Sequence, residues 1–226
     1  MELLKINRIL NKIKKKIIDL DLDLSGYNVL TEVGSSEYIF TPIIAALANA
    51  NRVIAYTKNS KYGLASENIL ECEKVLNSIG LQQKVEFYSN EISKLHLETA
   101  DIITNSGFLR PLDANKLKYL KENAVIPLMY EKWELRDSDI DVNYCKKNNI
   151  KVAGTWENHP SLLVFNHVGP LALKMALDAG YEVYENKIIV WSDDHFGKVI
   201  KEVFLNIGAN QVILTTNEEY LYDNID

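Results

Sequence analysis

Apolar residues along the chain follow two alternating patterns. Short runs of consecutive, mostly β-branched apolar residues predict strands buried on both faces, and they lie at 28–33, 52–56, 84–88, 101–104, 125–129, 151–153, 188–191 and 211–214. Between these runs, apolar residues recur at helical spacing and predict helices. This alternation predicts an α/β fold of Rossmann-like parallel sheets with helices on both faces.

The stretch from Pro160 to Ala179 is almost uniformly apolar and predicts a long helix buried on several sides, kinked at Gly169-Pro170. We expect this helix to join two units. Residues 1–158 would form a Rossmann-like or flavodoxin-like α/β domain that begins with an amphipathic helix. Residues 159–226 would hold the crossover helix and a partial dinucleotide-binding-like domain, with a ligand cleft between the two.

The segment 187–216 reads as strand, turn, helix and strand, the unit that holds dinucleotides when its turn has the pattern G-x-G-x-x-G. Only the last glycine of that pattern is present. The candidate cofactor-binding positions, for NAD or NADP, are the turn residues and the residue after the second strand: Ser192, Asp193, Asp194, Gly197 and Thr215. The simpler interpretation is that an aspartate or the serine only caps the helix. His195, beside two carboxylates, is the candidate catalytic base.

Charge and cysteine usage narrow the class of protein. The net charge of −6 argues against nucleic acid as the main partner, because phosphate contacts need clustered cations. No apolar run approaches the length of a membrane span. Cys72 and Cys145 lack the spacing of a metal site or redox motif, so we expect reduced thiols in a cytoplasmic protein. The scattered histidines predict no metal site.

Two further turns carry candidate chemistry. Asn105, Ser106 and Gly107 follow a predicted strand, and Arg110 lies close by, so this loop is a candidate site for a substrate carboxylate. The alternative is an ordinary turn with a solvated arginine. Trp156, near the expected junction, is a candidate substrate contact or a packing residue. The turn from Glu32 to Glu37 carries the Glu-x-Gly start of the methyltransferase turn that holds S-adenosylmethionine.

The segment from Asp101 to Gly180 resembles the D-2-hydroxyacid dehydrogenases of the formate/glycerate dehydrogenase type. Residues 100–120 resemble that family's strand, small-residue loop and helix near the substrate. Residues 137–156 resemble its segment ending in a short strand and turn, and residues 159–180 resemble its crossover helix. The resemblance implies a Rossmann-like oxidoreductase scaffold with NAD or NADP and a small-molecule substrate.

This sequence departs from that family at the functional positions. Tyr130–Glu134 replaces a glycine-rich loop, and Thr215 stands where an acidic residue would bind the adenosine ribose. No catalytic residue of the family can be carried over. Three hypotheses follow: a dehydrogenase-related protein with a small ligand between its units, an S-adenosylmethionine-dependent methyltransferase, and a non-catalytic subunit. In the third, the amphipathic helix at 2–20 forms a homodimer face.

Overall fold

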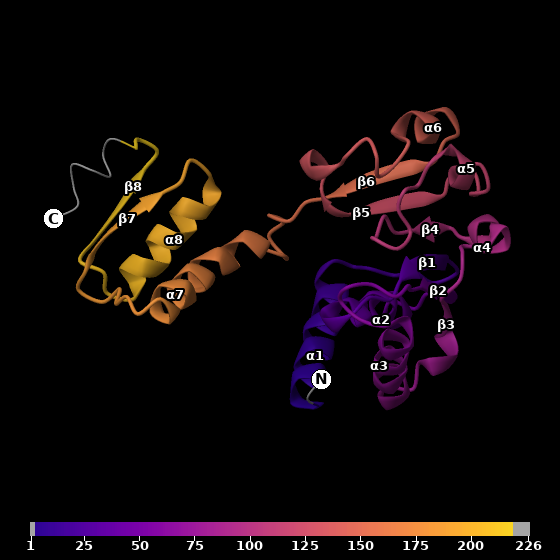
Figure 1. Ribbon diagram of the computed structural model, residues 1–226, viewed down its shortest axis with the longest axis horizontal. Coiled ribbons are helices and arrows are strands. Elements are labelled where there is room, and N and C mark those ends of the chain that lie inside the picture. The colour runs from indigo at the N-terminus through magenta and orange to yellow at the C-terminus, as the bar shows by residue number, and fades with distance from the viewer. Residues whose placement is uncertain (1–2, 219–226) are drawn as a thin grey trace. The chain divides into compact units, whose positions relative to one another are not determined.

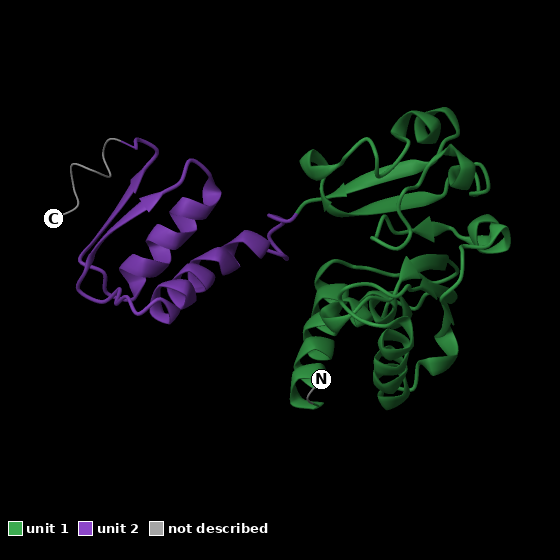
Figure 2. Ribbon diagram, in the orientation of Figure 1, with its two compact units in different colours: residues 1–156 green, residues 157–226 purple. Residues whose placement is uncertain are grey.

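The computed structural model describes residues 3–218, and the chain divides into two compact units, Met1–Trp156 and Glu157–Asp226 (Figure 2). The first unit is built on a sheet of six strands (Figure 1): β1 (Asn28–Glu32), β2 (Arg52–Tyr56), β3 (Val85–Tyr88), β4 (Ile102–Ile103), β5 (Val125–Glu131) and β6 (Lys151–Thr155). The strand order is β3-β2-β1-β4-β5-β6, and every neighbouring pair is parallel. The prediction of a parallel α/β sheet is confirmed.

Helices cover both faces of this sheet because its strands are apolar on both sides. Val29 and Val53 belong to one buried cluster, while their neighbours Leu30 and Ile54 belong to a second. The helices on the first face are α1 (Leu3–Asp19), α2 (Phe40–Leu47), preceded by the 3₁₀ turn η1 (Ser36–Ile39), and α3 (Ala65–Ser78). Those on the second are α4 (Lys94–Thr99), α5 (Ala114–Leu117) and α6 (Val142–Lys147).

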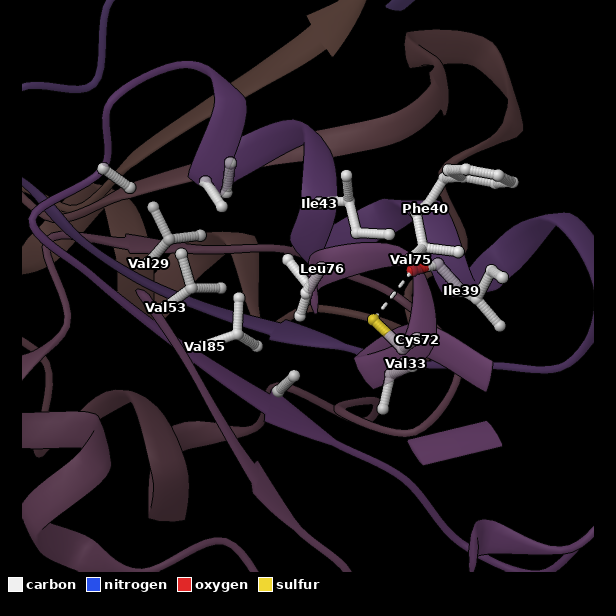
Figure 3. Packing of buried hydrophobic residues seen from close by; sticks show 14 of the residues in the cluster. Val29, Val33, Ile39, Phe40, Ile43, Val53, Cys72, Val75, Leu76 and Val85 are labelled. Carbon is white, nitrogen blue, oxygen red and sulfur yellow. Dashed lines mark hydrogen bonds between the residues drawn. The ribbon is translucent and has the colours of Figure 1, made fainter. Parts of the chain in front are cut away.

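The cluster on the first face is dry and well packed (Figure 3). Val29, Val53 and Val85 contribute one residue from each of three adjacent strands. Cys72 lies among them, and its thiol donates to the carbonyl of Ile39 at 3.3 Å. This packing fixes α2 and α3, and with them the loops that leave β1 and β2.

Helix α1 lays its apolar face on the same cluster. Leu10 is buried, and Ile6, Ile9 and Ile13 pack beside it. That face is therefore used inside the unit, and it is not the open surface that a homodimer through this helix would need. None of the described helices is long and apolar enough to cross a membrane.

The second unit contains β7 (Lys187–Trp191) and β8 (Gln211–Thr215), paired in parallel, with α8 (His195–Asn206) between them in sequence. Helix α7 (Val168–Asp178) packs with α8 over a small core that includes Val190, Phe204 and Val212. The predicted strand–turn–helix–strand unit is confirmed.

The predicted long, buried helix at 160–179 is wrong. A 3₁₀ turn, η4 (Val164–His167), precedes α7, which starts only at Val168. Pro170 therefore falls in the first turn, where its missing N–H costs no helical hydrogen bond and no kink is needed. The helix is also not buried all round, because Leu171, Met175 and Leu177 are exposed.

Candidate functional site

The strand order of the first unit reverses direction at β1, whose neighbours are β2 and β4. In open parallel sheets, ligands bind outside the carboxyl ends of the strands at such a reversal. The register places Glu32 opposite Tyr56 of β2, and Leu30 opposite Ile103 of β4. The residues that leave β1, β2 and β4 therefore meet at one edge of the sheet, and we call this the carboxyl edge.

Glu32 ends β1 and is the buried acidic group of this edge. Its carboxylate accepts the N–H of Phe108 at 2.9 Å, which ties the loop after β4 to β1. Burial raises the pKa of Glu32, and the Phe108 N–H and the charge of Arg110 offset part of that shift. A Cβ on Gly107 would lie 3.7 Å from the Glu32 carboxylate and 3.8 Å from the Arg110 guanidinium, so this glycine lies between the two charged groups.

Arg110 joins that carboxylate to a second acidic residue. Its Nη1 donates to Asp139 Oδ2 at 3.1 Å, and the Tyr130 hydroxyl donates to the same oxygen at 2.6 Å. Burial acts to raise the pKa of Asp139, but the hydrogen bonds from Tyr130 and Arg110 outweigh it, and the pKa lies below its ordinary value. The guanidinium also lies over the Tyr130 ring, 6.0 Å from the centroid. One cation thus bridges two carboxylates.

A chain of hydroxyl groups and one amide complete the polar core of this edge. Thr31 and Thr104 share a hydrogen bond of 2.9 Å, and Thr104 shares one of 2.8 Å with Ser106. Asn105 is fully buried, and its Oδ1 accepts the N–H of Met129 at 2.8 Å. Its Nδ2 has no partner within the described residues. A buried amide donor without an acceptor is uncommon and is usually explained by a water, an ion or a ligand group.

The loop after β1 is made of small residues held in a tight turn. A Cβ on Gly34 would lie 2.8 Å from the Cβ of Tyr38, so only glycine permits this close approach. Ser36 has φ of 58°, a left-handed conformation that few side chains accept without strain. A pocket of about 560 Å³ lies beside this loop and the loop after β2, and its lining includes Ser35, Ser36, Tyr62, Gly63, Asn68 and Lys74.

The ends of β2 and β3 carry an aromatic cluster that sequence reasoning did not identify. The Tyr56 hydroxyl and His96 Nδ1 lie 2.8 Å apart, and the Tyr88 ring centroid lies 4.3 Å from that of His96. Burial lowers the pKa of His96. Helix α4, which carries this histidine, is too short to show a helical period in the sequence.

The predicted turn of the second unit is closed by its own side chains. Asp194 caps α8, since its Oδ1 accepts the N–H of Phe196 at 2.9 Å and the Ser192 hydroxyl at 2.7 Å. Gly197 is buried, and a Cβ there would lie 2.5 Å from Leu214 Cδ1. The capping interpretation describes Asp194 well, and Gly197 serves close helix–strand packing.

The other predicted residues of this unit have modest surroundings. The carbonyl of Thr215 accepts the N–H of Ser192 at 3.1 Å, which joins the ends of β7 and β8. Asp193 is exposed, and so is His195, whose ring centroid lies 6.4 Å from that of Phe165. The carboxylates do not hold His195 as a base in any hydrogen bond that the structure describes.

The loop residues Asn105, Ser106, Gly107 and Arg110 are therefore brought together, but with partners that the sequence did not reveal. Asp139 lies 29 residues from Arg110 in sequence. Trp156 lies apart from them, exposed after β6, which is two strands away from β4. Among the described residues no group of histidine, cysteine and acidic side chains could hold a metal ion.

No protein-family model and no curated protein sequence matches the chain. Among solved structures, dipicolinate synthase from Bacillus halodurans is similar, with a TM-score of 0.54, 13% identity, and coverage of 89% of this chain and 66% of that one. Dipicolinate synthase from Bacillus subtilis has a TM-score of 0.51 and 13% identity, with coverage of 90% and 65%. The likeness is one of fold. The chain spans about two thirds of the length of these structures.

Proposed function

We propose that this chain is a dehydrogenase-related nucleotide-binding protein that takes NAD or NADP at the carboxyl edge of its first unit. The observation that carries the proposal is the strand order β3-β2-β1-β4-β5-β6, the order of dinucleotide-binding sheets, with polar residues gathered where it reverses. The resemblance of the sequence to D-2-hydroxyacid dehydrogenases and the fold shared with dipicolinate synthase support the same class.

The groups at this edge suit the parts of a nucleotide differently. The small residues Gly34, Ser35 and Ser36 allow a phosphate to approach the backbone after β1. The unpartnered Nδ2 of Asn105 offers a donor to a hydroxyl or carbonyl oxygen. Glu32 is held by a backbone N–H and lies near Arg110, so its charge is partly balanced. A neutral or singly charged part of the ligand fits near it.

The second unit is the alternative placement, at Ser192, Asp193, Asp194, Gly197 and Thr215. Two observations count against a pyrophosphate there. Asp194 already satisfies the N-terminal N–H of α8, and its carboxylate would repel a phosphate. Hydrogen bonding from the Ser192 hydroxyl lowers the pKa of Asp194, so that charge is present at neutral pH.

S-adenosylmethionine is the second candidate ligand, and one observation favours it. Glu32 and Gly34 occupy the start of the methyltransferase turn directly after β1. In the structure, however, the Glu32 carboxylate is engaged with Phe108 and is buried. We therefore rank this cofactor below the nicotinamide nucleotides.

Calorimetric titration and thermal unfolding with NAD, NADP and S-adenosylmethionine test the proposal. Ligand at about 100 times its dissociation constant should stabilise the fold by roughly 2.7 kcal/mol. Ser36→Asp should weaken nicotinamide nucleotide binding at least about fivefold, because like charges about 4 Å apart repel by roughly 1 kcal/mol even in water. Ser36→Asn is the matched control, since asparagine has the same shape and also accepts the left-handed conformation.

Asp194→Asn separates the two placements. It keeps the helix cap and removes the charge, so it should leave binding unchanged if the nucleotide lies in the first unit. Stronger binding by Asp194→Asn, with no effect of Ser36→Asp, would place the nucleotide in the second unit. Absence of binding by both nicotinamide nucleotides would refute the proposal.

A further inference from the structure

Lys58 follows the end of β2, at the position where NAD-binding sheets carry an acidic residue for the ribose hydroxyls. The residues leaving the strand are Thr57, Lys58, Asn59, Ser60 and Lys61, and none of them is acidic. Lys58 is exposed and, in the described part of the chain, its ammonium has no hydrogen bond or ion pair. A carboxylate for a ribose 2′-hydroxyl is therefore missing, and an unpaired cation stands close to its place.

Lys116, on the far side of β1, presents a second ammonium group. Its Nζ donates to the carbonyls of Leu109 at 2.9 Å and Pro111 at 2.7 Å, both in the loop after β4. These two bonds hold the half-buried side chain in place and leave the third ammonium N–H for another acceptor.

The two ammonium groups are close enough to influence each other. Burial lowers the pKa of Lys116, Asp113 opposes that shift, and the positive charge of Lys58 adds to it. Loops from β2 and β4 thus bring like charges together over the end of β1, and among the described residues Asp113 is the acidic neighbour that acts on Lys116. An anion between the two lysines would relieve the repulsion.

We propose that Lys58 and Lys116 bind a phosphomonoester carried by the ribose of the nucleotide, so that the site prefers NADP to NAD. This inference rests on the proposed function and names the form of the ligand. A phosphomonoester carries more than one negative charge at neutral pH and offers three acceptor oxygens, enough to take a hydrogen bond from each lysine. NAD has only a hydroxyl at that position, and a hydroxyl gains little from two cations.

Titration calorimetry of the full chain with NADP, NAD, 2′,5′-ADP and inorganic phosphate tests the inference. We expect NADP to bind about ten- to hundredfold more tightly than NAD, the range given by one or two charge-assisted hydrogen bonds. Lys58→Gln should remove most of that preference by weakening NADP and leaving NAD unchanged. Lys61→Gln is the matched control, because Lys61 lies in the same loop with its Nζ 4.9 Å from the Tyr62 ring centroid.

The outcomes separate the inference from the proposed function. Equal affinities for NADP and NAD would overturn the phosphomonoester while leaving nucleotide binding intact. Failure of both nucleotides would mean that the proposed function itself is wrong. An equal loss of NADP affinity in Lys58→Gln and Lys61→Gln would reduce the effect to general charge and overturn the site. Inorganic phosphate that binds as tightly as 2′,5′-ADP would show a phosphate site without a nucleotide and would also overturn the inference.

Discussion

Asp139→Asn removes one charge from the network at the carboxyl edge and keeps its shape. In the native protein, this carboxylate accepts hydrogen bonds from the Tyr130 hydroxyl at 2.6 Å and the Arg110 guanidinium at 3.1 Å. Hydrogen bonds to charged groups contribute about 1.5–3 kcal/mol, and removal of one partner of a buried pair costs about 3–5 kcal/mol. Arg110 is about one quarter exposed, which places the expected loss near 2–3 kcal/mol.

The pH dependence of this loss follows from the pKa of Asp139, which lies below its ordinary value because of those two hydrogen bonds, despite the opposing effect of burial. A depressed pKa means that the folded state favours the ionised form. The stabilisation is therefore fully present above the unfolded-state pKa of about 4, and it is lost as pH falls through the lower folded-state pKa. The gap between wild type and Asp139→Asn should be constant near neutral pH and narrow in acid.

Hydrogen exchange resolved by peptide is the assay, because it reports the opening free energy of β1, β4 and β5 separately from the second unit. Asp137→Asn is the control, since Asp137 is exposed and only two residues away. The control should change the opening free energy by no more than about 0.5 kcal/mol. If Asp139→Asn behaves like Asp137→Asn, the network does not stabilise the edge and the reasoning is refuted.

Three further predictions concern buried groups. Burial raises the pKa of Glu32, so its charge opposes folding at neutral pH; Glu32→Gln should be at least as stable as wild type near pH 7 in urea unfolding, and this advantage should vanish near pH 3.5. Burial raises the pKa of Cys72 to about 12 and that of Cys145 to about 11, so neither thiol should react with a disulfide reagent in the native protein near pH 8, while both should react in urea. Gly197→Ala should destabilise the second unit by about 1–3 kcal/mol in hydrogen exchange of β7 and β8, since its Cβ would lie 2.5 Å from Leu214 Cδ1; an unchanged opening free energy would contradict the packing.

The sequence was sufficient to predict the sheet, because buried parallel strands leave a strong signal. Runs such as Arg52–Tyr56 are apolar on both faces, and the structure places them between two helical layers. It was misleading at 160–179, where apolar composition alone suggested a buried helix. Burial depends on neighbouring elements, and α7 has a neighbour on one side only within its unit, so Met175 and Leu177 remain exposed.

The candidate site could be predicted only in part. The loop from Asn105 to Arg110 was recognisable because small polar residues follow a strand. Its partners were not, since Glu32 and Asp139 reach Phe108 and Arg110 through contacts 76 and 29 residues apart in sequence. The strand order, which decides where the chain reverses, is a property of tertiary pairing. For that reason the sequence directed attention to the glycine of the second unit rather than to the end of β1.

Hydrogen-exchange mapping of the full chain with and without NADP tests the central claim most directly. The account predicts protection in three loops of the first unit, at residues 33–36, 57–64 and 104–116, and no change at residues 192–197. Protection at 192–197 alone would place the nucleotide in the second unit. Protection nowhere, at a nucleotide concentration that saturates the calorimetric titration, would contradict binding at the carboxyl edge.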